Sequence, residues 1–325
     1  MHILILGAAG MVGRKLVERL ARDGHLGGRE ITSALLHDVV LPIAPAQGFP
    51  SECRVSDFAN PGEAEALITK RPDIIFHLAA IVSGEAEADF DKGYRINLDG
   101  TRQLFDAIYR AGGGYCPRVV FTSSIAVFGA PFPELIGDTF LNAPLTSYGV
   151  QKTIGELLLM DYTRKGIFDG VGIRLPTICV RPGAPNKAAS GFFSNICREP
   201  LAGEEAVLPV SEDVQHWHAS PRSAVGFLLH AAALPGDVIG PRRNLSMPGL
   251  SCTVGEQIAA LRRIGGEKVV ARIRREPDPV IERIVAGWPR NFDPQRALAL
   301  GFVAEASFDE ILRVHVEDEL GGHIA

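Results

Sequence analysis

Short apolar runs and amphipathic stretches alternate along the first half of the chain. Residues 2–6, 31–40, 73–80, 118–124 and 170–174 are apolar runs of strand length. The longer segments between them carry apolar residues at helical spacing. Strands and helices that alternate at intervals of roughly 25–35 residues predict an α/β fold, a Rossmann-like doubly wound parallel sheet.

The second half of the chain is less periodic and richer in proline, with six prolines from Pro176 to Pro221. Residues 222–233 predict a helix that returns to the sheet. Two sequences of the form S/T-x-x-E, starting at Thr253 and Ser307, are typical of helix starts and predict helices at about 254–264 and 308–318.

These differences predict two domains. We expect a first domain of residues 1–174 plus about 219–247, which contains the parallel sheet. A smaller C-terminal lobe of about 175–218 plus 248–325 would bind the substrate.

A glycine-rich turn follows the first strand. Its spacing is G-x-x-G-x-x-G, and an amphipathic stretch follows it. Glycines at such a turn let the backbone pass close to a pyrophosphate, and the N-terminus of the next helix supplies free N–H groups. The residues expected to bind the phosphates of a dinucleotide are Gly7, Gly10, Met11, Val12 and Gly13.

Residues at the ends of later strands extend this dinucleotide site. Asp38 ends the second strand, where a carboxylate can bind both ribose hydroxyls and repel a 2′-phosphate, so it favours NAD over NADP. The alternative for Asp38 is a solvated strand-end carboxylate. Asp57 is a candidate acceptor for the adenine amino group. The run Leu78-Ala79-Ala80 supplies small residues where a backbone must approach the cofactor.

The segment from Phe121 to Lys152 holds the candidate catalytic groups. Tyr148 and Lys152 are four residues apart, so in a helix they share one face. A nearby positive charge lowers the pKa of a tyrosine and makes it a useful general base. Ser124 ends a strand at the carboxyl edge of the sheet, where ligands bind in open α/β sheets. The competing interpretation is a surface Tyr and Lys on an amphipathic helix.

Composition narrows the class of partner. The net charge of −5 gives no basic excess, which argues against nucleic acid or an anionic membrane as the partner. The five cysteines are odd in number and lack Cys-x-x-Cys spacing, so we expect reduced core thiols. The first apolar run is too short for a signal peptide, and no later run has membrane-spanning length. We expect a cytoplasmic protein that acts on a small molecule.

Together these motifs resemble the extended short-chain dehydrogenase/reductase superfamily over essentially the whole chain. Further matching pieces are His77-Leu-Ala-Ala80 and Asn97-Leu-Asp-Gly-Thr101. The resemblance implies that the cofactor is NAD, that Tyr148 is the acid/base, and that Lys152 lowers its pKa and binds the nicotinamide ribose.

The same resemblance implies roles for several other residues. Ser124 would hydrogen-bond the reacting oxygen, and Asn97 would be the structural asparagine of a proton relay. The segment expected to line the nicotinamide is Leu175, Pro176 and Thr177.

Within the superfamily, segments between Arg174 and Ser194 and at Trp288-Pro-Arg-Asn-Phe292 resemble the NAD-dependent D-erythronate dehydrogenases. Those enzymes oxidise a four-carbon sugar acid at C2. The loop His77–Ser83 also resembles that of short-chain L-threonine dehydrogenases, whose serine contacts the substrate carboxylate. With Ser124 and Tyr148 at the reacting hydroxyl, the candidates for holding a carboxylate are Ser83, Arg181, Asn186, Lys187 and Ser190.

Two other functions remain open. An NAD-dependent sugar-nucleotide epimerase uses the same Tyr, Lys and Ser, although such members commonly have tyrosine where this chain has Phe128. A cofactor-binding sensor without catalysis is disfavoured because all three catalytic residues are present. Ile125-Ala126 stand where dehydratases have Asp-Glu, so a 4,6-dehydratase is disfavoured.

Two further expectations concern metals and assembly. His216-Trp-His218 places two histidines in one extended segment with no clear third ligand, so we expect no metal. The superfamily suggests a homodimer through a helix pair near the Tyr148 helix.

Overall fold

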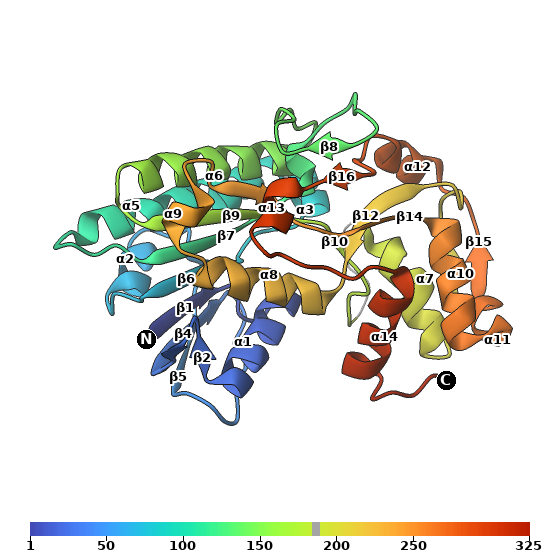
Figure 1. Ribbon diagram of the computed structural model, residues 1–325, viewed down its shortest axis with the longest axis horizontal. Helices are drawn as coiled ribbons and strands as arrows, with labels where there is room; N and C mark the ends of the chain where they lie inside the picture. The colour runs from blue at the N-terminus through green and yellow to red at the C-terminus, as the bar shows by residue number, and fades with distance from the viewer. Residues whose placement is uncertain (184–188) are drawn as a thin grey trace. The chain divides into compact units, whose positions relative to one another are not determined.

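The computed structural model describes residues 1–183 and 189–325, which form two compact units (Figure 1). The first comprises Met1–Val127, Thr146–Leu175 and Val225–Ser246, and the second comprises Phe128–Leu145, Pro176–Ala224 and Met247–Ala325. Residues 128–145, which the sequence analysis assigned to the first domain, thus belong to the second unit. The cofactor and substrate roles assigned to the two domains stay predictions.

The first unit is built on a parallel sheet of seven strands, which confirms the predicted fold class. Its central strands are buried on both faces, as continuous apolar runs require. In sheet order the strands are β13 (Asn244–Ser246), β9 (Asp169–Leu175), β7 (Arg118–Ser124), β6 (Ile74–His77), β1 (His2–Leu6), β4 (Ser33–Asp38) and β5 (Ser51–Val55).

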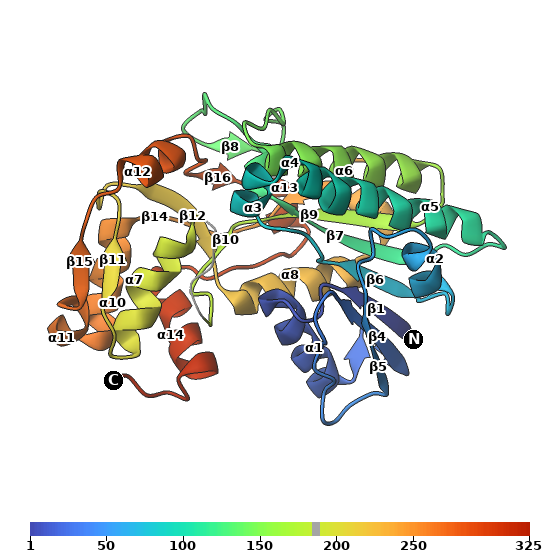
Figure 2. The ribbon, with the colours of Figure 1, turned by 180° about the vertical axis from the view of Figure 1, so that it is seen from behind.

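Helices cover both faces of this sheet (Figures 1 and 2). Apolar residues of α2 (Glu63–Ile68), α5 (Thr101–Ala111) and α6 (Ser147–Arg164) pack on one face in a single core. On the other side lie α1 (Met11–Asp23) and α8 (Pro221–Ala233). Short elements of this unit include a hairpin of β2 (His25–Leu26) and β3 (Arg29–Glu30), a 3₁₀ turn (Ile125–Val127) and α9 (Gly236–Ile239).

Strand order reverses at β1, which places a ligand crevice there. The chain runs from β1 to β4 and β5, then crosses back to β6 on the other side of β1. At such a switch point the connections leave the sheet in opposite directions and open a crevice at the carboxyl ends. The glycine turn after β1 and residues 78–80 after β6 both lie at that edge.

Several short helical elements follow β6. Ile81 and Val82 lead into α3 (Ser83–Ala88). From Phe90 the chain forms α4 (Phe90–Gly93), a π-helix (Tyr94–Gly100) and α5 in succession. A π turn changes the hydrogen-bond pattern of a helix and so shifts where the following side chains point.

The second unit contains short strands and a separate core. One sheet contains three strands in the order β10 (Thr177–Ile178), β12 (Gln215–Ala219) and β14 (Leu250–Thr253). Two further sheets have two strands each: β11 (Ala206–Leu208) pairs with β15 (Ile273–Arg275), and β8 (Ile136–Gly137) pairs with β16 (Phe292–Asp293). Its helices are α7 (Gly191–Leu201), α10 (Val254–Gly265), α11 (Glu267–Val270), α12 (Pro279–Ala286), α13 (Gln295–Ala299) and α14 (Phe308–Glu319).

The two predicted helix starts in this unit are confirmed. Thr253 accepts from the Glu256 backbone while the Glu256 carboxylate accepts from the Thr253 N–H, a complete capping box. Ser307 accepts from the Glu310 N–H, although the Glu310 carboxylate binds the Ala306 N–H instead. No helix among the described residues is long and apolar enough to cross a bilayer.

Buried neutral histidines predict loss of stability in acid. Burial lowers the pKa of His77 to about 3 and that of His216 to about 4, from an ordinary 6.5. The unfolded chain therefore takes up protons below pH 6.5 that the folded chain does not bind, and stability falls as pH drops from 6.5 towards 4. Each histidine should contribute roughly 1 kcal/mol per pH unit.

Urea unfolding between pH 7.5 and pH 4.5 measures this slope. His77→Gln should reduce the proton uptake on unfolding by about one, whereas His323→Gln, at the exposed C-terminal end, should leave it unchanged. An unfolding free energy that stays flat across this range would contradict the prediction.

Candidate active site

The glycine turn brings the N-terminus of α1 against the segment that follows β6. Gly7 has φ of 87°, and a Cβ there would lie 2.8 Å from the Ala79 nitrogen. A Cβ on Gly13 would lie 2.1 Å from the Gly7 carbonyl oxygen, so only glycine lets α1 pack this closely on the turn. The first turn of α1 has no acidic residue, which leaves its N–H groups and positive dipole end suited to an anion. This cradle fits a dinucleotide pyrophosphate.

Asp38 is tied to the same turn. Its Oδ2 accepts from the Ala9 N–H at 2.9 Å and its Oδ1 accepts from the Val39 N–H at 2.7 Å. A carboxylate has about four acceptor positions, so these two bonds leave room for ribose hydroxyls. The structure thus brings Asp38 next to the predicted phosphate site.

Asp57 has a partner that the sequence did not reveal. Its Oδ2 forms an ion pair with Arg95 at 2.7 Å, and its Oδ1 accepts from the Ala59 N–H at 3.0 Å. Contact with adenine would therefore use its remaining acceptor positions. That role stays a prediction.

Ser124, Tyr148 and Lys152 belong to two neighbouring elements, β7 and α6. Ser124 ends β7 and accepts from the Ala126 N–H at 3.1 Å, which leaves its hydroxyl proton able to be donated to another oxygen. Tyr148 lies in the first turn of α6, whose N-cap Thr146 accepts from the Gly149 N–H at 3.1 Å. The Lys152 ammonium lies 5.7 Å from the centre of the Tyr148 ring. The spacing prediction of a shared helix face is therefore confirmed.

The Lys152 ammonium is buried against β7. Its Nζ donates to the Thr122 carbonyl at 2.9 Å and lies 4.9 Å from the centre of the Phe121 ring. Burial lowers the pKa of Lys152 to about 8, and the Glu156 carboxylate opposes that shift. Close approach of α6 to β7 depends on Gly155, because a Cβ there would lie 2.8 Å from the Phe121 ring.

A buried ion pair that the sequence analysis missed supports this edge. Glu156 lies one turn beyond Lys152, and its two carboxylate oxygens accept from Arg174 at 2.8 and 2.7 Å. Ser123 donates to the same carboxylate at 2.6 Å. The pair joins α6 to β9 and β7. The sequence did carry a signal for this pair, because Glu156 follows Lys152 at the same four-residue spacing that separates Lys152 from Tyr148.

Asn97 joins the segment after β6 to α6. Its Oδ1 accepts from the Ile81 N–H at 2.9 Å, and its Nδ2 donates to the Ile81 carbonyl at 3.2 Å and to Gln151 Oε1 at 2.8 Å. Asn97 is buried, and its backbone carbonyl accepts from Thr101 at 2.7 Å. This arrangement suits a structural role, while the proton relay stays a prediction.

Several predicted residues lie in the second unit or near its start. Leu175 ends β9 in the first unit, and Pro176 leads into β10. Thr177 bonds His216 Nε2 at 2.7 Å, while His216 Nδ1 lies 2.8 Å from the Pro289 carbonyl. Because a carbonyl only accepts, Nδ1 carries the proton and the Thr177 hydroxyl donates to Nε2.

The predicted carboxylate-binding residues are only partly described. Arg181 donates to the Ile178 carbonyl at 3.0 Å and to the Ser190 hydroxyl at 2.8 Å, so the structure brings these two candidates together. Ser83 is the first residue of α3 in the first unit. Asn186 and Lys187 lie outside the described residues. Among the described residues, no group of three or more His, Cys, Asp or Glu is placed to hold a metal ion.

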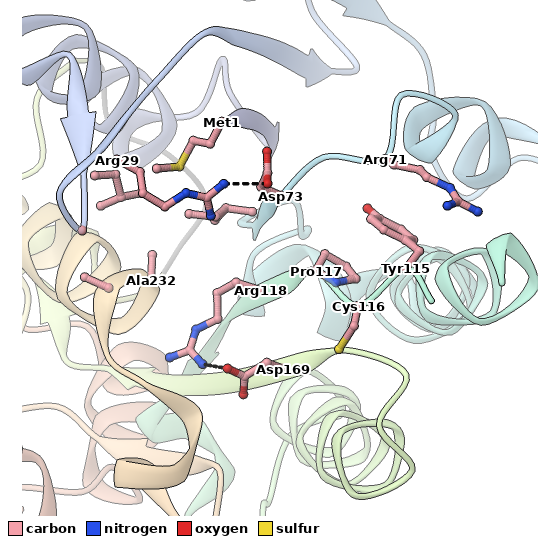
Figure 3. Close-up of a pocket in the computed structure, with 14 residues that line it drawn as sticks. Met1, Arg29, Arg71, Asp73, Tyr115, Cys116, Pro117, Arg118, Asp169 and Ala232 are labelled. Carbon is pink, nitrogen blue, oxygen red and sulfur yellow. Dashed lines mark hydrogen bonds and ion pairs between the residues drawn. The ribbon is translucent and has the colours of Figure 1, made fainter. Parts of the chain in front are cut away.

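A pocket of about 430 Å³ opens at the opposite edge of the sheet, at the amino ends of the strands (Figure 3). Charged residues in its wall pair with one another: Arg29 with Asp73 at 2.8 Å and Arg118 with Asp169 at 2.6 Å. Parallel strands place Ser124 and the glycine turn at the other end. This pocket is therefore separate from the candidate active site.

Comparison with known proteins identifies the family. Residues 3–218 match the NAD dependent epimerase/dehydratase family. The chain belongs to this family. It is 45% identical over 322 residues to the D-erythronate dehydrogenase of Cupriavidus necator, covering 98% of each chain. It is 41% identical to that of Haemophilus influenzae, covering 98% of this chain and all of the relative.

A solved structure shares both sequence and fold with this chain. It is described as the nucleoside-diphosphate-sugar epimerase from Agrobacterium tumefaciens. The two chains are 66% identical with a TM-score of 0.98, over all of this chain and 96% of the other.

Asp38 should determine the choice between NAD and NADP. Asp38→Asn keeps a side-chain oxygen for the Ala9 N–H but removes the charge that repels a 2′-phosphate. The ratio of kcat/KM for NADP to that for NAD should rise by about 10- to 100-fold.

Steady-state rates with each cofactor measure this ratio. Asp23→Asn, at the end of α1 beside Arg19, is the matched control and should leave it unchanged. A wild-type protein that used NADP as well as NAD would show that Asp38 does not select the cofactor.

Proposed function

We propose that this protein is an NAD-dependent dehydrogenase that oxidises the C2 hydroxyl of D-erythronate to 2-dehydro-D-erythronate. The observation that carries the proposal is the full-length identity of 45% and 41% to two D-erythronate dehydrogenases. The arrangement of Ser124, Tyr148 and Lys152 at the carboxyl edge of the sheet supports a redox reaction of this kind.

The proposed chemistry uses one base and one oxygen-binding hydroxyl. Tyr148, as a phenolate, removes the proton of the substrate hydroxyl, and Ser124 donates to the same oxygen throughout. The Lys152 charge stabilises the phenolate, and the Thr122 carbonyl holds the ammonium in place. NAD, when bound, would supply the hydride acceptor for C2. Gly7, Gly10, Gly13 and Asp38 would hold its pyrophosphate and adenosine ribose.

Recognition of the substrate carboxylate is assigned to Arg181 and Ser190, with Ser83 as a further candidate. Guanidinium groups bind carboxylates through two parallel hydrogen bonds, which is the reason to prefer Arg181. Its fixed position against the Ile178 carbonyl lowers the entropy lost on binding. Asn186 and Lys187 stay candidates on sequence grounds alone.

One observation favours a second function, a sugar-nucleotide epimerase. The solved structure at 66% identity is described as a nucleoside-diphosphate-sugar epimerase. An epimerase would use the same tyrosine, lysine and serine but return the hydride to its substrate. Net formation of NADH therefore separates the two functions.

Turnover is the direct test. Purified protein with NAD and D-erythronate should form NADH in proportion to substrate consumed, measured by absorbance of the reduced cofactor. Tyr148→Phe should lower kcat by several orders of magnitude while NAD affinity stays nearly unchanged, because phenylalanine keeps the ring beside the cofactor and loses only the hydroxyl that removes the proton.

Two results would overturn this proposal. The absence of NADH with four- to six-carbon sugar acids, L-threonine and related hydroxy acids would exclude the dehydrogenase. Interconversion of a nucleotide sugar at constant total NAD would then establish the epimerase. Full activity of Tyr148→Phe would exclude the assigned base.

We also propose that the protein is a cytoplasmic homodimer formed through α5 and α6. Each helix exposes a large side chain, Tyr109 at 63% and Leu157 at 60%. Burying such side chains in a helix pair would remove apolar surface from water. Sedimentation velocity should detect a dimer for the wild type and a shift towards monomer for Leu157→Glu. A wild-type monomer would exclude this assembly.

A further inference from the structure

A glutamine in the catalytic helix is fully buried although the chemistry above does not use it. Gln151 precedes Lys152 in α6 and has none of its surface exposed. Its Oε1 accepts from Asn97 Nδ2 at 2.8 Å, while its Nε2 has no hydrogen-bond partner among the described residues. Leaving a buried N–H unpaired costs roughly 1–3 kcal/mol. A residue that only filled this space would be more stable as an apolar side chain.

The Asn97 end of this bond leads to the segment after β6. Asn97 holds both the N–H and the carbonyl of Ile81, at 2.9 and 3.2 Å. Ile81 directly follows Leu78, Ala79 and Ala80, the segment proposed to approach the cofactor. A continuous path of hydrogen bonds therefore runs from that segment through Asn97 to α6.

The backbone around Asn97 is shaped to admit the glutamine. A Cβ on Gly93 would lie 2.7 Å from Gln151 Nε2, so the amide fits because residue 93 has no side chain. Gly93 is followed at once by the π-helix Tyr94–Gly100, which carries Asn97. π turns insert a residue into a helix and thereby change where later side chains point. Here the turn carries the side chain that reaches both Ile81 and Gln151.

We propose that Gln151 is a positioning residue, which acts through Asn97 to fix the spacing between residues 78–81 and the helix that carries Tyr148 and Lys152. The proposal rests on the proposed function, since it concerns the same groups. Transfer reactions depend steeply on distance, and a misplacement of about 1 Å can cost about 100-fold in rate. Gln151 itself contacts neither the reacting oxygen nor the proton.

The first test is Gln151→Met, which keeps the volume and removes the acceptor. We expect kcat to fall about tenfold while the KM values for substrate and NAD change less than about threefold. The matched control is Gln257→Met in the second unit. Gln257 is also fully buried, and its Nε2 lies 2.8 Å from His218 Nε2. That variant should lower Tm comparably and leave kcat within about twofold.

A double-mutant cycle separates positioning from a general structural role. If Gln151 acts only through Asn97, Gln151→Met should have no further effect on kcat in an Asn97→Ala background. Losses that add in the double variant would overturn the proposal. So would an unchanged kcat for Gln151→Met, or an equal fall in kcat for Gln257→Met.

Hydrogen exchange tests the inference without turnover. The Ile81 N–H is bonded to the Asn97 side chain, so Gln151→Met should speed its exchange, and Gln257→Met should not. If the wild type formed no NADH, the proposed function would fail, and this measurement would still decide the positioning role. Unchanged exchange at Ile81 in Gln151→Met would contradict it.

Discussion

The buried ammonium of Lys152 is the constraint on which the catalytic edge depends. Removing a charge from water is costly, and burial lowers the pKa of this lysine to about 8. The charge is kept near neutral pH because the Thr122 carbonyl, the Phe121 ring and the Glu156 carboxylate surround it. Two of these lie on β7, so the charge stays beside Tyr148 only while α6 packs closely on that strand.

The last three residues of β7 each carry a hydroxyl, and these hydroxyls lie in different surroundings. Thr122 donates to the His77 carbonyl at 3.0 Å and so ties β7 to β6. Ser123, on the opposite face, donates to Glu156. Ser124 ends the strand at its carboxyl end, where the proposed function places the reacting oxygen. Side chains alternate between the two faces of a strand, so successive hydroxyls reach different partners. Thr122 bonds the neighbouring strand, and Ser123 bonds a residue of α6.

Those parts of the site that depend on local sequence were predictable. The glycine turn, Asp38 and Ser124 follow strand ends, and Tyr148 and Lys152 share a helix face, so short-range spacing was enough to find them. Gln151 and the Glu156–Arg174 pair were not found, because each is explained by a partner distant in sequence. Asn97 is 54 residues from Gln151, and Arg174 is 18 from Glu156. The second unit was predicted least well, since strands such as Thr177–Ile178 are only two residues long and depend on pairing with distant segments.

The groups assigned to catalysis, Ser124, Tyr148 and Lys152, lie in the first unit and do not by themselves separate a dehydrogenase from an epimerase. Both reactions begin with removal of a hydroxyl proton and transfer of a hydride. They differ in the next step, because an epimerase must keep its reduced intermediate and present the other face for return of the hydride. A nucleotide substrate also requires a large pocket for its base, whereas a small sugar acid requires a fixed cation for its carboxylate. In the second unit Arg181 is a cation held in place by the Ile178 carbonyl and Ser190. Guanidinium groups bind phosphates as well as carboxylates, so this cation fits either substrate. The preference for the dehydrogenase therefore rests on the full-length identity to the two D-erythronate dehydrogenases.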